Sequence, residues 1–106
     1  MIIGGPPCPA FTRIGRAKLR DLRGDPQAYR NDPRASLYLP YLTFVEQLAP
    51  VALVMENVPD LLNFGGHNLG EEIAEALDDL GYVARYTVLN AANYGVPQTR
   101  ERVFIV

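Results

Sequence analysis

The sequence predicts an α/β fold in which a mostly parallel, twisted sheet ends in an antiparallel hairpin. Apolar runs rich in β-branched residues, typical of buried strands, alternate with stretches whose apolar residues recur every three or four positions, typical of covering helices. The last two apolar runs are joined by a connection too short for a crossover helix, so their strands should be antiparallel. Strands are expected at 1–3, 51–55, 82–89 and 103–106, and helices at 33–48 and 69–80.

The chain has 106 residues, enough for one domain at most, and both ends fall within apolar runs, so we expect a fragment of a larger domain. One cysteine and one histidine give neither a disulfide framework nor a metal site, which indicates a reducing, cytoplasmic setting. No apolar run approaches the roughly 20 residues of a membrane span, and no signal peptide is recognisable. We therefore expect no membrane and no metal.

Charge is unevenly distributed along the chain, although the formal net charge is only −2. Seven of the ten basic residues fall at 13–34, whereas 46–80 holds eight acids and no Lys or Arg. The basic segment could bind phosphates, or it could be a soluble loop of mixed charge.

The only cysteine, Cys8, follows the first strand in Gly4-Gly5-Pro6-Pro7-Cys8-Pro9. Glycines permit close approach and prolines stiffen the chain, so the thiol should be presented on a rigid corner. A lone cysteine is more often a small buried residue, but this surrounding favours a nucleophile.

Residues 12–33 lack apolar periodicity and should form a long, arginine-rich lid over a polyanion. Asp32 as N-cap and Pro33 then begin a helix that runs to about Leu48. Pro40 should kink this helix, unless its regular part begins later. The expected core face comprises Leu37, Tyr41, Phe44, Val45 and Leu48.

The apolar run Val51–Met55 should form a strand buried on both faces. It ends at Glu56, and acids at the carboxyl ends of parallel strands mark ligand sites in open α/β sheets, although a glutamate that merely caps a loop is the alternative. A loop from Leu61 to Asn68 precedes a helix that Asn68 should cap and Gly81 should end.

The remaining elements are a helix with a stripe of four apolar residues, a strand over Tyr82–Leu89, a turn over Asn90–Pro97, the segment Gln98–Arg102 and a final strand. The stripe comprises Leu69, Ile73, Leu77 and Leu80.

Three segments, Gly-Pro-Pro-Cys ending at Cys8, Glu56-Asn57-Val58, and Gln98-x-Arg100-x-Arg102, together resemble the cytosine carbon-5 DNA methyltransferase family and occur in its order. The resemblance spans nearly the whole chain, and Pro9 departs from it, since the family usually has Gln there. It implies part of a Rossmann-like, S-adenosylmethionine-dependent methyltransferase sheet. Residues 1–106 would be its catalytic half, without the cofactor-binding strands and the target-recognition region, and inactive in isolation.

The resemblance also implies roles. Cys8 would attack carbon 6 of a flipped cytosine, Glu56 would supply a proton at ring nitrogen 3 if burial keeps that proton available, and Arg102 would hold the ring carbonyl. S-adenosylmethionine would be contacted by Gly5 and Pro7. The substrate-binding residues would be Pro7, Thr12, Asn57, Gln98 and Arg100.

The implied partner is double-stranded DNA, in a restriction-modification or other methylation setting, with a monomeric full-length protein. Two alternatives stay open: a tRNA cytosine-5 methyltransferase of the same family, and a non-catalytic truncated remnant. A thiol-redox protein is disfavoured because a second cysteine is missing.

Overall fold

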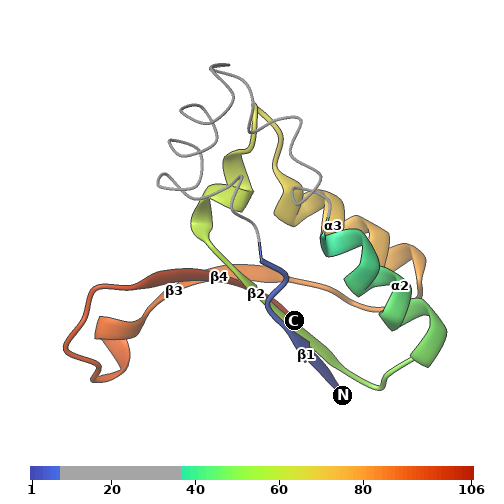
Figure 1. The fold of residues 1–106 in the computed structure, drawn as a ribbon, viewed down its shortest axis with the longest axis horizontal. Helices are drawn as coiled ribbons and strands as arrows, with labels where there is room; N and C mark the ends of the chain where they lie inside the picture. Colours follow the sequence, from blue (N-terminus) through green and yellow to red (C-terminus); the bar gives the residue numbers. More distant parts are fainter. Residues whose placement is uncertain (8–36) are drawn as a thin grey trace.

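The computed structural model describes residues 1–7 and 37–106. The segment predicted as an arginine-rich lid and the predicted helix start at Asp32-Pro33 lie outside the described residues. In chain order the elements are β1 (Ile2–Gly4), α2 (Tyr38–Leu48), β2 (Leu53–Asn57), the 3₁₀ helix η3 (Pro59–Asn63), α3 (Leu69–Asp79), β3 (Tyr86–Asn90), the 3₁₀ helix η4 (Ala91–Tyr94) and β4 (Glu101–Ile105) (Figure 1).

The four strands form one sheet in the order β1-β2-β4-β3. β1 and β2 are parallel, and β4 runs antiparallel to both of its neighbours. β3 therefore points in the same direction as β1 and β2, so three strands share one direction and β4 is the exception. This confirms the predicted α/β sheet and its antiparallel C-terminal hairpin.

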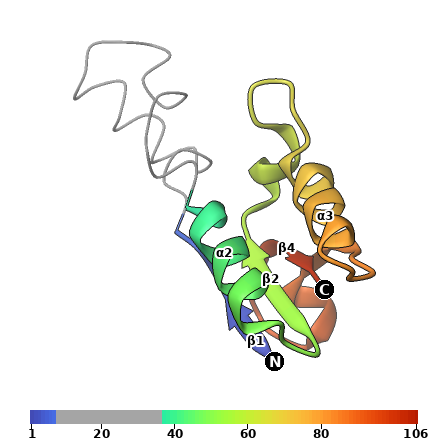
Figure 2. The same cartoon turned by 90° about the vertical axis from the view of Figure 1, so that its right-hand side faces the viewer.

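One face of the sheet carries the core. Alternate residues on β2 and β4 are buried with residues of α2 and α3, which lie on the same side of the sheet (Figures 1 and 2). The intervening residues, among them Glu56, Arg102 and Phe104, point to the opposite face because successive side chains alternate. The prediction that the strand at 51–55 is buried on both faces is therefore wrong for one face.

Helix α2 begins at Tyr38, so Pro40 lies in its first turn, where a missing amide hydrogen costs no intrahelical bond. Of the two alternatives for Pro40, the later start is the one observed. Tyr41 and Val45 are buried as expected, but Phe44 and Leu48 are 58% and 65% exposed. Phe44 falls on the flank of the buried stripe, and Leu48 is the last residue of the helix.

The segment predicted as a loop from Leu61 to Asn68 instead begins within η3, which buries Leu61 completely. The predicted cap is confirmed, because Asn68 Oδ1 accepts a hydrogen bond from the Glu71 amide at 3.2 Å. Ile73 and Leu77 are buried, whereas Leu80 lies beyond the last helical residue and is 39% exposed. Gly81 has φ +91° and ends the helix as predicted.

β3 begins at Tyr86, four residues later than predicted, because the chain before it is held by other groups. The Tyr82 hydroxyl donates to the Pro50 carbonyl at 2.8 Å, and the Ala84 amide donates to Asp78 Oδ1 at 3.0 Å. β4 begins at Glu101, ahead of the predicted Val103. Within residues 1–7 and 37–106, no helix has the length and apolar character needed to cross a membrane.

Tyr41 joins α2 to β1. A Cβ atom on Gly4 would lie 2.8 Å from the Tyr41 ring, so the ring packs directly on the strand backbone. The Tyr41 hydroxyl is buried and has no hydrogen-bond partner in the described part of the chain. Burial raises the pKa of Tyr41 above its usual value near 10.

We expect Tyr41→Phe to leave the free energy of unfolding at neutral pH unchanged or to raise it by up to about 1 kcal/mol, because it removes an unpaired buried hydroxyl. Because the pKa of Tyr41 is higher in the folded state than in the unfolded state, the contribution of this residue to the free energy of unfolding is complete below about pH 10. That contribution is lost as the pH rises further. Urea unfolding at neutral pH and near pH 11 should therefore show a smaller alkaline loss in Tyr41→Phe than in wild type.

The control is Tyr94→Phe, since Tyr94 is 68% exposed. Equal alkaline losses in wild type and Tyr41→Phe would contradict the expectation.

Candidate functional site

The carboxyl ends of β1 and β2 lie side by side because these strands are parallel, with Gly4 opposite Met55. The chain after β1 therefore passes next to Glu56. A Cβ atom on Gly5 would lie 3.0 Å from Glu56 Oε2 and 3.6 Å from the Glu56 carbonyl oxygen. A side chain at position 5 would therefore press against the Glu56 carboxylate, and glycine avoids this contact.

Asn57, the last residue of β2, joins the two strand ends. Its side chain is among the buried ones, with 7% of the residue exposed. Asn57 Nδ2 donates to the Pro6 carbonyl at 3.2 Å, and Oδ1 accepts from the Val58 amide at 2.9 Å. Asn57 therefore fixes the peptide that leads into Pro7 and Cys8 relative to Glu56. Its predicted contact with substrate stays a prediction.

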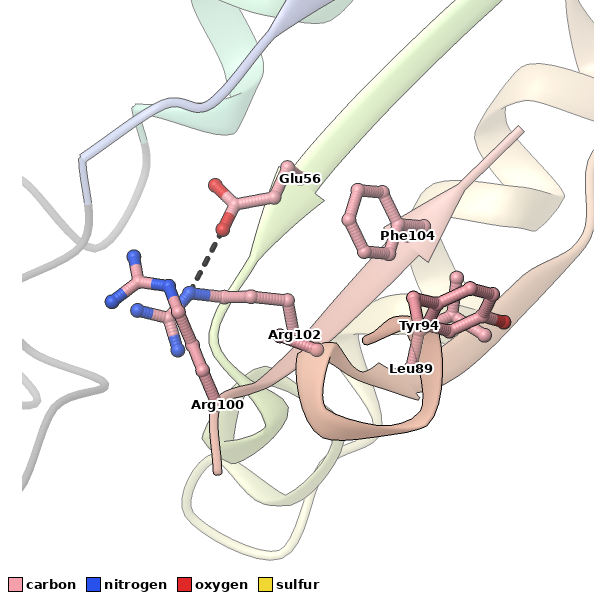
Figure 3. Close-up of a pocket in the computed structure, with 7 residues that line it drawn as sticks. Glu56, Leu89, Tyr94, Arg100, Arg102 and Phe104 are labelled. Atoms are coloured by element: carbon pink, nitrogen blue, oxygen red, sulfur yellow. Dashed lines mark ion pairs between the residues drawn. The ribbon is translucent and has the colours of Figure 1, made fainter. Parts of the chain in front are cut away.

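An ion pair links β2 to β4. Arg102 Nε lies 2.9 Å from Glu56 Oε1, a distance typical of a charge-assisted hydrogen bond (Figure 3). The side chains of Glu56 and Arg102 are 39% and 23% exposed. The burial expected for Glu56 is thus not observed in this chain, because the face of the sheet that carries Glu56 is the one opposite the helices.

A cavity of about 340 Å³ opens beside this ion pair, within the usual size range of roughly 300–1,000 Å³ for ligand pockets. Glu56, Arg100 and Arg102 line its charged end, where the two arginine side chains extend toward Glu56 (Figure 3). The remainder of the lining is largely apolar and comprises Leu89, Ala91, Tyr94 and Phe104.

The structure brings six of the predicted site residues to one edge of the sheet. Two of them follow β1, two end β2, and two lie just before or within the start of β4. In that order they are Gly5 and Pro7, Glu56 and Asn57, and Arg100 and Arg102. Gln98 is exposed in the connection before β4, and its amide donates to the Val96 carbonyl at 2.7 Å. Cys8 and Thr12 lie outside the described residues.

The apolar wall of the cavity was not predicted from the sequence. Phe104 could have been found from alternation, because it is two residues from Arg102 on β4 and so shares its face. Leu89 is paired with Arg102 in the β3–β4 register, which the sequence alone does not give. Over the described ranges, no group of three His, Cys, Asp or Glu side chains could hold a metal ion.

Comparison with known proteins gives a consistent result. The family model for C-5 cytosine-specific DNA methylases matches residues 1–106. A protein of Oceanobacillus iheyensis is 46% identical over 106 residues, which are 100% of this chain and 23% of that protein. The type II methyltransferase M.AgeI of Thalassovita gelatinovora is 43% identical over 106 residues, covering 99% of this chain and 22% of the relative.

A solved structure has a similar fold: a methyltransferase of Entamoeba histolytica aligns with a TM-score of 0.56 and 22% identity, over 97% of this chain and 30% of that one. The chain thus spans about a quarter of the length of its first curated relatives.

We expect Asn57→Ala to lower the free energy of unfolding by about 1 to 3 kcal/mol, because it leaves the Pro6 carbonyl and the Val58 amide without their partner in a poorly hydrated place. Urea unfolding measures this. Asn63→Ala makes the same chemical change at an exposed position and should have little effect. Equal losses in the two variants would show that the Asn57 bonds do not stabilise the fold.

Proposed function

Because the chain belongs to the C-5 cytosine-specific DNA methylase family, we propose that its full-length gene product transfers a methyl group to carbon 5 of cytosine in DNA. The observation that supports this most strongly is the Glu56–Arg102 ion pair next to the strand end that leads into Cys8. Residues 1–106 supply the catalytic half of the methyltransferase domain in this proposal.

The nucleophile is Cys8. Carbon 5 of cytosine is a poor nucleophile, so the thiolate first forms a bond to carbon 6, which moves electron density toward carbon 5. Carbon 5 then accepts the methyl group. Water takes up the proton of carbon 5, the electron pair of that bond re-forms the double bond between carbon 5 and carbon 6, and the bond between carbon 6 and sulfur breaks to release Cys8 as a thiolate. The Pro6–Asn57 hydrogen bond supports this role, because it fixes the chain two residues before the thiol.

Glu56 and Arg102 act on the same edge of the cytosine ring. Their interacting atoms are 2.9 Å apart, and ring nitrogen 3 and the carbonyl at carbon 2 are neighbours, so one ring can meet both groups. In its protonated form, Glu56 donates a proton to nitrogen 3 during thiolate addition and takes this proton back when the carbon–sulfur bond breaks. Arg102 donates to the carbonyl oxygen and orients the ring.

The family implies S-adenosylmethionine as cofactor, and two residues of this chain fit one edge of such a ligand. Gly5 and Pro7 are exposed at the carboxyl end of β1, where open α/β sheets bind ligands, and Gly5 has no Cβ to obstruct approach. When bound, this cofactor supplies the methyl group as an electrophile. Gly5 and Pro7 contribute contacts that hold it beside the nucleophile.

The substrate is double-stranded DNA with the cytosine flipped out, because neither carbon 6 nor nitrogen 3 can be reached within the base stack. The Pro7 carbonyl accepts from the exocyclic amine, which distinguishes cytosine from thymine. Further contacts come from Asn57 and Arg100, as well as from Thr12 and Gln98.

We expect the full-length gene product to form a covalent adduct with DNA that contains 5-fluorocytosine in the presence of S-adenosylmethionine, because fluorine at carbon 5 blocks the elimination that releases Cys8. Denaturing gel electrophoresis detects the adduct. Cys8→Ala should abolish it, and an adduct that persists in this variant would identify another nucleophile.

If no adduct forms, a chimera distinguishes two explanations: that the rest of the methyltransferase domain is lacking, or that residues 1–106 are themselves non-catalytic. In it, residues 1–106 replace the matching segment of the Thalassovita gelatinovora relative. If the unaltered relative forms the adduct and the chimera does not, residues 1–106 belong to a non-catalytic remnant. Adduct formation only with tRNA would assign the tRNA alternative.

We expect Glu56→Gln to reduce methyl transfer by 100-fold or more, on the order expected for loss of a general acid, while DNA affinity changes little. Transfer of labelled methyl groups and equilibrium DNA binding measure the two effects. Glu101→Gln, at the exposed first residue of β4, is the matched control and should retain activity. Equal losses of transfer and binding in Glu56→Gln would instead indicate a structural role.

A further inference from the structure

Asn90 closes the base of the connection between β3 and β4. It is the last residue of β3, and its Oδ1 atom accepts two hydrogen bonds, from the Ala92 amide at 3.1 Å and from the Arg100 amide at 3.3 Å. The first bond begins the 3₁₀ helix η4, and the second spans ten positions of the sequence. One side chain therefore joins the start and the end of this connection.

Both backbone polar groups of Arg100 are bound at this point. Its amide donates to Asn90 Oδ1, and its carbonyl accepts from the Ala91 amide at 3.0 Å. Arg100 precedes the first residue of β4, Glu101, so the strand ladder does not fix its amide. The Asn90 side chain supplies the bond that the ladder lacks.

The Arg100 side chain needs this support because its charged surroundings do not hold it. Arg100 and Arg102 both line the charged end of the cavity together with Glu56, and both side chains extend toward Glu56 in Figure 3. In the part of the chain that the structure describes, Glu56 forms an ion pair with Arg102, and none is recorded for the exposed Arg100. Two like charges that line the same end of a cavity repel, so the position of Arg100 depends on its backbone.

We propose that Asn90 is a positioning residue that holds Arg100 at the mouth of the cavity, where the Arg100 guanidinium binds a phosphate of the DNA strand that carries the flipped base. This inference rests on the proposed function. Among the described residues no ion pair occupies the exposed Arg100 guanidinium, and Arg100 lines the charged end of the cavity, where a guanidinium can bind a phosphate.

The test is the salt dependence of DNA affinity, because each phosphate contact contributes about 0.9 to the slope of log K against log salt concentration. The full-length gene product is compared with Arg100→Ala, Asn90→Ala and the double variant, in equilibrium binding to one duplex. We expect both single variants to lower the magnitude of the slope by about 1 and the affinity several-fold. The double variant should be no weaker than Arg100→Ala, because Asn90 acts through Arg100.

Asn93→Ala is the matched control, since Asn93 is an exposed asparagine in η4 for which no side-chain hydrogen bond is recorded among the described residues. It should keep the wild-type slope. The inference is overturned if Asn90→Ala behaves like Asn93→Ala, or if its effect adds to that of Arg100→Ala.

If Asn90→Ala does not fold, Asn90→Asp and Asn90→Leu decide by hydrogen exchange, because a carboxylate can accept both amide hydrogens and a leucine can accept neither. The Arg100 amide should stay protected in Asn90→Asp and exchange faster in Asn90→Leu; equal protection would overturn the inference. If the wild-type protein binds DNA but transfers no methyl group, the proposed function is contradicted. The inference about Asn90 and Arg100 is not affected by that result.

Discussion

The parallel pairing of β1 with β2 is the constraint on which the candidate site depends. Parallel strands end at the same edge of a sheet, so the chain that leaves Gly4 must pass the carboxyl end of β2. Gly5 permits the close approach to Glu56, and the bond from Asn57 to the Pro6 carbonyl then fixes the path of the chain. The site thus follows from strand direction, from one residue without a side chain and from one buried amide.

The Glu56–Arg102 pair uses a second consequence of strand direction. β4 runs opposite to β2, so the beginning of β4 lies beside the end of β2, and a residue near the start of one strand meets a residue near the end of the other. In the absence of substrate the two charges neutralise each other. Under the proposed function, an entering ring would have to offer both an acceptor for Arg102 and a group for Glu56, which favours a molecule with two different polar atoms on one edge.

The order of the helices α2 and α3 and of the strands, and the placement of six candidate site residues at one edge of the sheet, were predictable because they depend on local signals: apolar periodicity, the Asn68 cap, Gly81, and polar residues at strand ends. Boundaries and exposure were less predictable because they depend on partners distant in sequence. Tyr82–Ala84 have strand propensity, but the Tyr82 hydroxyl bonds to Pro50 and the Ala84 amide bonds to Asp78 of α3, so β3 begins later. Phe44 and Leu48 have helical spacing, yet Phe44 lies on the flank of the buried stripe and Leu48 at the end of the helix, and both are exposed.

The β3–β4 hairpin is closed at its base by the Asn90 side chain and by the Ala91–Arg100 backbone bond, and this has a consequence for sequence variation among homologous chains. Changes at the tip beyond this closure, around Tyr94 and Gly95, need not be transmitted to the strand that carries Arg102. Insertions and deletions are best tolerated at exposed tips of this kind, and the closure separates them from the chemistry. The hairpin can thus differ in length from one homologue to another while its arginines keep their place in the sheet.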